Sequence, residues 1–219
     1  MAETSRPLPR SVWLGSSLAF GLIGLAVFVA LLQDARSKKT PLPIIIGQVA
    51  DFTLTNQDGN ISTLADFTNC VWVADIIFTS CAGPCPRMTM QMKSLQEKLP
   101  AASRARLVTL TTFPEFDTPE LLKKYGTHYG ADFSRWTFLT GAKAEIGKLA
   151  SGSLKLASQP VKPEEQQNPA DLFIHSTYFV VVDKRAQLRA VFETGGEGVD
   201  WTNAVLPKII ATVRQLESE

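Results

Sequence analysis

The sequence predicts an α/β domain with a parallel sheet, preceded by a single transmembrane helix. Two observations support this prediction. Apolar runs of strand length alternate with segments of helical periodicity, and one long uncharged apolar stretch lies near the N-terminus. A β-α-β-α order favours parallel strand pairing. We divide the 219 residues into a short tail (1–11), a transmembrane anchor (12–32), a linker (33–43) and one folded domain (44–219).

The anchor has the length and composition of a membrane span. No charged residue occurs between Arg10 and Asp34, and about 21 helical residues extend roughly 31 Å, the thickness of a bilayer core. A cleaved signal peptide is the alternative, but the apolar run is long and no small-residue cleavage site follows it. Basic residues flank both ends, so the charge rule leaves the orientation open.

No Arg-rich and Ser-rich transit sequence precedes the span, which favours a bacterial membrane over an organelle. We therefore expect a single-pass protein of the bacterial cytoplasmic membrane, with its folded domain facing the periplasm or the exterior.

The folded domain is expected to begin with a hairpin followed by a buried strand. Asp58-Gly59 is a turn signal between two β-prone runs, 52–55 and 60–64. The next run, residues 71–78, reads VWVADIIF. It is apolar and rich in β-branched and aromatic residues, so it predicts a strand buried on both faces.

A helix is predicted over residues 86–99. Pro86 suits a first helical position, and Met88 and Met92 follow the helical period with the leucines behind them. Together with Met90 they could suggest a methionine-rich copper site. Because two of the three share the leucine face, we favour core packing.

The rest of the domain continues the alternation. Strand-like runs end at turn signals, and Asp117-Thr118-Pro119 supplies a helix cap and a first-turn proline. The expected elements are strand 107–112, a helix toward Tyr125, strand 136–139, helix 142–150, a polar connection 160–170, strands 177–183 and 187–192, and helix 201–216.

Charge and cysteine content restrict the function. Lys and Arg total 22 against 21 Asp and Glu, with no long basic run, so nucleic-acid binding is disfavoured. Three cysteines are too few for a structural disulfide framework. Two of them, Cys81 and Cys85, lie four positions apart. Cys70 stands alone and is interpreted as a small buried apolar residue.

Cys81 and Cys85 lie where the buried strand ends and the next helix begins, the place where α/β sheets put ligand sites. A helix N-terminus stabilises negative charge, so we expect a lowered thiol pKa there. Two soft sulfurs favour Cu(I). Their spacing lets both face one side of a helical turn, close enough for a two-sulfur chelate or for a disulfide. The spacing alone does not decide between a metal chelate and a disulfide.

At these residues the chain resembles the Sco/SenC family. The match begins with IIFTSCAGPCPRMTMQM, which has the family's strand, CxxxCP motif and following helix. DTPELLKKYGTHYGADFSRWTFLTG is similar to the family's central region, and DLFIHSTYFVVVD to the segment that carries its metal-binding histidine. The resemblance covers roughly residues 49–193.

The resemblance implies a thioredoxin-like fold with an N-terminal hairpin extension. It also implies that Cys81, Cys85 and His175 bind copper, as Cu(I) or Cu(II), and that the two cysteines can form a redox-active disulfide. The implied role is a metallochaperone without catalytic residues. It would deliver copper to cytochrome c oxidase or prepare its copper site, with the copper-site subunit or another copper or thiol protein as partner.

Two departures from the family pattern bear on the site. Phe113 stands where the family commonly has an aspartate before a proline, and Ala82-Gly83-Pro84 replaces a frequent Pro-Asp-Val between the cysteines. The first departure leaves the outer-shell role of that position in doubt. The second bears on loop stiffness and partner choice.

Three other functions fit the sequence less well than copper binding. A thiol-disulfide oxidoreductase acting on periplasmic protein cysteines needs the two thiols but no histidine, and the CxxxC spacing argues mildly against it. Structural zinc needs a fourth ligand that the sequence does not offer. A peroxidase needs a reactive cysteine in its own pocket, and the paired motif gives no support for one.

His128 matches no motif and is expected on the surface. Asp75, an acid inside the buried strand, leaves function and structure equally open.

Overall fold

The computed structural model describes residues 24–25, 28, 42–156, 159–160, 173–174 and 177–219. Residues 42–219 form one compact unit. Across the described ranges no helix has the length and hydropathy that a bilayer crossing requires. The predicted span, residues 12–32, lies almost entirely outside these ranges, so the anchor stays a prediction.

Among the described residues, eight strands form one mixed sheet in the order β1-β10-β9-β4-β5-β6-β2-β3. The central strands β4, β5 and β6 pair in parallel, and the flanking strands pair antiparallel. The strands are β1 (Gly47–Gln48), β2 (Thr53–Asn56), β3 (Ile61–Thr63), β4 (Trp72–Ile77), β5 (Arg106–Thr111), β6 (Trp136–Thr140), β9 (Tyr178–Val182) and β10 (Gln187–Glu193), with β7 (Gln159–Pro160) and β8 (Phe173–Ile174) as a separate pair.

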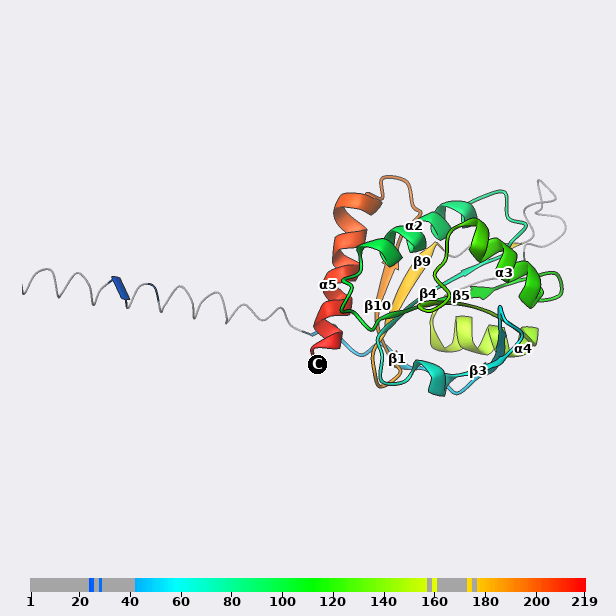
Figure 1. Cartoon of the computed structure of the whole chain (residues 1–219), viewed down its shortest axis with the longest axis horizontal. Helices are drawn as coiled ribbons and strands as arrows, with labels where there is room; N and C mark the ends of the chain where they lie inside the picture. The colour runs from blue at the N-terminus through cyan, green and yellow to red at the C-terminus, as the bar shows by residue number, and fades with distance from the viewer. Residues whose placement is uncertain (1–23, 26–27, 29–41, 157–158, 161–172, 175–176) are drawn as a thin grey trace, which may run out of the picture. The chain divides into compact units, whose positions relative to one another are not determined.

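Helices cover both faces of this sheet (Figure 1). They are α2 (Cys85–Lys98), α3 (Pro119–His128), α4 (Lys143–Gly147) and α5 (Leu206–Glu217). A 3-10 turn follows β3 at Leu64–Phe67. In the described part of the chain two π-helical turns occur, one continuing α4 at Lys148–Ser153 and one leading into α5 at Trp201–Val205.

Strand β4 divides the core between the two faces because side chains alternate along a strand. Trp72 and Ile76 belong to one apolar cluster, which includes residues of α4. Val73 belongs to the other, which includes Met88 and Met92 of α2 and the apolar stripe of α5. All six β4 residues are buried. Asp75 lies on the same side of the strand as Val73, so its carboxyl enters the core beneath α2.

The predicted alternation of strands and helices is confirmed, including the leading hairpin. β2 and β3 pair antiparallel across the Asp58-Gly59 turn, where Gly59 has a φ of +78° that glycine adopts readily. Two features differ from expectation. The short edge strand β1 was not predicted, because its pairing with β10 depends on a partner 140 positions away. The helix expected over 142–150 is α-helical only at Lys143–Gly147 and continues as a π-helical turn to Ser153.

Candidate metal centre

A tight turn at the end of β4 presents the first cysteine of the CxxxC motif. The Cys81 backbone N–H donates to the Phe78 carbonyl at 3.2 Å, which closes the turn. Cys85 is the first residue of α2, with Pro84 and Pro86 on either side. A proline suits the first helical turn because the missing N–H would have had no helical partner there. The predicted junction between a buried strand and a helix is confirmed, but Cys81 lies in the turn before α2 and not on a helical turn together with Cys85.

The two thiols are buried and interact with each other. Cys81 is 6% exposed and Cys85 is 2% exposed, and both cysteines are in the thiol form. The Gly83 backbone N–H donates to Cys81 Sγ at 3.3 Å. A hydrogen bond between the thiols raises the pKa of Cys85, and burial and the nearby Cys81 raise it further, while a Phe78 backbone hydrogen bond opposes them.

The predicted lowering of the thiol pKa is therefore wrong for Cys85. Proximity to the helix N-terminus is outweighed by burial and by the neighbouring sulfur, so Cys85 keeps its proton and donates it toward Cys81. Cys81 Sγ therefore has two hydrogen-bond partners, the Gly83 N–H and the Cys85 thiol. The predicted disulfide between the two remains a prediction.

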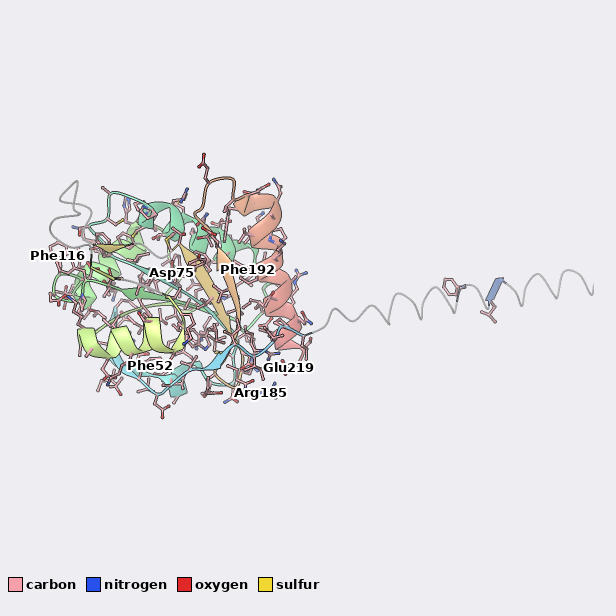
Figure 2. The ribbon with its side chains drawn as sticks, turned by 180° about the vertical axis from the view of Figure 1, so that it is seen from behind. Phe52, Asp75, Phe116, Arg185, Phe192 and Glu219 are labelled. Carbon is pink, nitrogen blue, oxygen red and sulfur yellow. The ribbon has the colours of Figure 1, made fainter. Side chains whose placement is uncertain are left out.

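Aromatic side chains surround the cysteine pair. Ile77 and Phe78 form one apolar cluster with the two cysteines, and Phe113 and Tyr125 pack against it. The ring of Phe113 stacks on Phe116 at a centroid distance of 5.7 Å, and Phe116 is half exposed. Phe116 lies at the end of the domain away from Arg185 and Glu219 (Figure 2). The ring of Phe113 therefore packs against the apolar cluster that contains both thiols.

Asp75 lies close enough to Cys85 for its charge to raise the pKa of that thiol. Its carboxyl is fully buried, and burial raises its own pKa to about 7. Thr109 Oγ1 donates to Asp75 Oδ1 at 2.6 Å and accepts a hydrogen bond from Trp136 Nε1 at 2.9 Å. Asp75 Oδ2 has no hydrogen-bond partner among the described residues. A buried acid therefore stands behind the cysteine pair.

The structure describes some of the residues that the sequence analysis singled out, but not all of them. His175 lies outside the described residues, so its role as third ligand stays a prediction. Within the described part of the chain no three metal-binding side chains gather at one place. His128 is exposed at the end of α3, as predicted. Cys70 is partly buried, and its thiol donates to the Phe67 carbonyl at 3.2 Å.

Met88 and Met92 are fully buried in the core, whereas Met90 is 56% exposed. The core-packing interpretation of the first two is confirmed. The sequence did not single out Asp117 within the predicted cap segment Asp117-Thr118-Pro119. The cap of α3 is Thr118, whose Oγ1 accepts from the Leu121 backbone N–H at 3.3 Å. Asp117 points inward instead, toward the turn that presents Cys81.

Comparison with known proteins places this arrangement in a family. Residues 47–208 match the SCO1/SenC family model. The SCO1 protein homolog of Bacillus subtilis is 39% identical over 137 residues, which cover 62% of this chain and 68% of that protein. The chain belongs to the SCO1/SenC family.

Solved Sco structures agree in fold. BsSco, a member of the Sco family of cytochrome c oxidase assembly proteins in which a disulfide switch was identified, is 33% identical with a TM-score of 0.67, covering 83% of this chain and 99% of that one. Copper-bound ScoI of Bradyrhizobium japonicum is 17% identical with a TM-score of 0.58, covering 77% and 99% of the two chains. At that identity the likeness shows the fold alone.

The cysteine pair of this Sco chain fits a soft metal ion as cargo. Two thiols that already share a hydrogen bond lie close enough to share one ion, and loss of their protons turns both into thiolates, the form that binds metal. Thiolate donors in an apolar surrounding favour Cu(I) over hard oxygen-preferring ions.

Proposed function

We propose that this protein binds copper through Cys81, Cys85 and His175 and either delivers it to cytochrome c oxidase or prepares the copper site of that enzyme. The observation that carries the proposal is the buried, hydrogen-bonded thiol pair at the end of β4. Family membership supports the same function. A three-ligand site leaves the metal transferable, as a donor protein requires.

The protein's own groups suit each step of binding and release. The Gly83 N–H stabilises negative charge on Cys81 Sγ. Cys85 gives up its proton only when a metal ion or a disulfide replaces it, because the metal-free pKa is raised. The apolar cluster of Ile77, Phe78 and Phe113 excludes water from both sulfurs. Bound copper would be protected from bulk solvent while partner thiols approach from the exposed Ala82-Gly83 loop.

A thiol-disulfide oxidoreductase acting on periplasmic protein cysteines is the second candidate. The hydrogen bond from Gly83 to Cys81 favours it, since Cys81 is then the attacking thiolate. Cys81 would attack a partner disulfide and release one partner thiolate. Cys85 would then lose its proton and attack the mixed disulfide, which forms the Cys81–Cys85 bond and frees the second partner thiolate.

We further propose that the chain is held in a bacterial cytoplasmic membrane by residues 12–32, with the folded domain facing the periplasm or the exterior. The uncharged apolar stretch supports this placement. The test is carbonate extraction of membranes from cells that express the full chain. Retention in the pellet, lost when the stretch carries two added lysines, supports an anchor, and release of the unaltered chain contradicts it.

An anaerobic Cu(I) titration of the reduced full chain in detergent, against a competing chelator, tests the copper proposal. We expect one tight equivalent that is lost in Cys81→Ser and in Cys85→Ser but kept in Cys70→Ser, the matched control thiol. His175→Ala should weaken binding, and His128→Ala should not. Copper binding that survives loss of both motif cysteines would falsify the proposal. Binding that ignores His175, with full reductase activity in His175→Ala, would favour the oxidoreductase.

A further inference from the structure

Asp117 has a buried carboxylate that is neither the cap of α3 nor one of the proposed metal ligands. It is fully buried in the loop between β5 and α3. Within the described residues it forms no ion pair, so neutral donors alone compensate its lost hydration. A buried charged group is retained only with such hydrogen bonds. The residues that donate these hydrogen bonds therefore identify the segments that Asp117 holds in place.

Those donors come from the ends of two adjacent parallel strands. Thr79, just beyond β4, donates to Asp117 through its backbone N–H, at 3.4 Å from Oδ1 and 3.2 Å from Oδ2, and through its hydroxyl. Thr111, the last residue of β5, donates its hydroxyl to Asp117 Oδ2. The Phe113 N–H donates in turn to Thr111 Oγ1 at 2.9 Å. One carboxylate thus joins the loops that follow both strands.

Thr79 belongs to the turn that fixes both cysteines. The turn runs from Phe78 to Cys81 and is closed by the Cys81 N–H. The backbone of Phe78 also hydrogen-bonds to the Cys85 thiol. A displacement of Thr79 would therefore move the anchor points of both sulfurs relative to each other. No other side chain among the described residues is shown to hydrogen-bond to the Thr79 backbone N–H.

We propose that Asp117 is a positioning residue for the Cys81–Cys85 pair: by holding Thr79, it sets the distance and orientation of the two sulfurs. The inference rests on the proposed copper function and names a residue that acts through another rather than touching the metal. It also accounts for the position of Phe113, whose N–H joins the same network while its ring packs against the apolar cluster that contains the thiols.

Asp117→Asn tests this proposal because it keeps the shape and removes one acceptor. The Thr79 backbone N–H lies against both carboxylate oxygens, at 3.4 and 3.2 Å. In either orientation of the amide it therefore faces the new NH₂ group at one of these positions, and the hold on the turn is weakened. The matched control is Asp183→Asn. Asp183 is also a buried acid, accepting from the backbone N–H groups of Arg185 and Gln187 at 2.8 and 2.9 Å. It lies in the turn between β9 and β10, away from the cysteines.

The readouts are the Cu(I) dissociation constant of the reduced full chain in detergent and the equilibrium of the Cys81–Cys85 disulfide in a dithiothreitol redox buffer. We expect Asp117→Asn to weaken Cu(I) binding roughly 10- to 100-fold, as loss of outer-shell partners does, and to shift the disulfide equilibrium. Asp183→Asn should lower the melting temperature and leave both readouts unchanged. Asp117→Asn with wild-type copper affinity and only a lower melting temperature overturns the proposal.

Thr79→Val decides the question if Asp117→Asn does not fold. It keeps the buried carboxylate and the backbone N–H but removes the hydroxyl donor, so a smaller loss of copper affinity is expected. Unchanged affinity in a folded Thr79→Val overturns the positioning role. A wild-type chain that binds no Cu(I) would instead contradict the proposed function, and the disulfide equilibrium of the Asp117 variant would then test the positioning role by itself.

Discussion

The buried carboxyl of Asp75 makes the stability of the domain depend on pH in a way that one substitution can remove. Burial, the largest cause, raises its pKa from about 3.8 to about 7, against the opposing hydrogen bond from Thr109. Asp75→Asn keeps the size of the side chain and an oxygen for Thr109. It abolishes the titration.

The expected change in the free energy of unfolding follows from the size of the pKa shift of Asp75. Well below pH 3.8 the carboxyl is protonated in both the folded and the unfolded chain, and its contribution to stability is fully present. As the pH rises toward 7 the unfolded chain loses the proton first, so unfolding is favoured progressively. A shift from 3.8 to about 7 corresponds to a loss of up to about 4 kcal/mol at 1.36 kcal/mol per unit. Above pH 7 the loss is complete.

The assay is urea unfolding of reduced, metal-free residues 42–219, followed by circular dichroism between pH 4 and 8. We expect the wild-type free energy of unfolding, minus that of Asp75→Asn, to fall by up to about 4 kcal/mol across this range. Asp58→Asn is the control. Asp58 is exposed, and its hydrogen bond with Lys123 lowers its pKa, so its difference should be small and of opposite sign. A wild-type minus Asp75→Asn difference that stays constant with pH would refute the reasoning.

Two further substitutions test the packing with matched controls. A Cβ on Gly126 would lie 2.8 Å from the Phe138 ring, so Gly126→Ala should destabilise the folded domain by roughly 1–3 kcal/mol. A Cβ on Gly147 would have no atom within 4 Å, so Gly147→Ala should stabilise the domain by up to about 1 kcal/mol. Calorimetric melting compares the two variants. Arg189 is buried and donates to two carboxylates and to a backbone carbonyl. Arg189→Ala should therefore cost roughly 3–5 kcal/mol, whereas the exposed Arg185→Ala should cost under about 1 kcal/mol in urea unfolding. Equal losses within either pair would contradict the packing described.

Local patterns were sufficient to predict the elements around the site. The run 71–78 is a buried strand because every residue but Asp75 is apolar or small, and the helix after Cys85 has a proline in its first turn and a stripe of apolar residues. Both features depend on neighbours in the chain. For that reason the strand–CxxxC–helix junction, and the closeness of its two sulfurs, could be predicted from the sequence.

What the sequence did not reveal depends on contacts across the fold. Asp117 precedes a threonine and a proline and so resembles a helix cap, but its main donor, Thr79, is 38 positions away. The raised pKa of Cys85 arises from burial and from Cys81, which together outweigh a helix-terminus effect that spacing alone suggests. The packing of Phe113 against the cluster that contains the thiols likewise depends on the sheet, since the parallel pairing of β4 and β5 brings the two loops together.

X-ray absorption at the copper edge of the Cu(I)-loaded full chain tests the central claim most directly, because it reports which atoms bind the metal. We expect two sulfur ligands and one nitrogen ligand. The nitrogen should be lost in His175→Ala and retained in His128→Ala, and both sulfurs should be retained in Cys70→Ser. A copper environment without sulfur, or one unchanged in Cys81→Ser plus Cys85→Ser, would contradict the account.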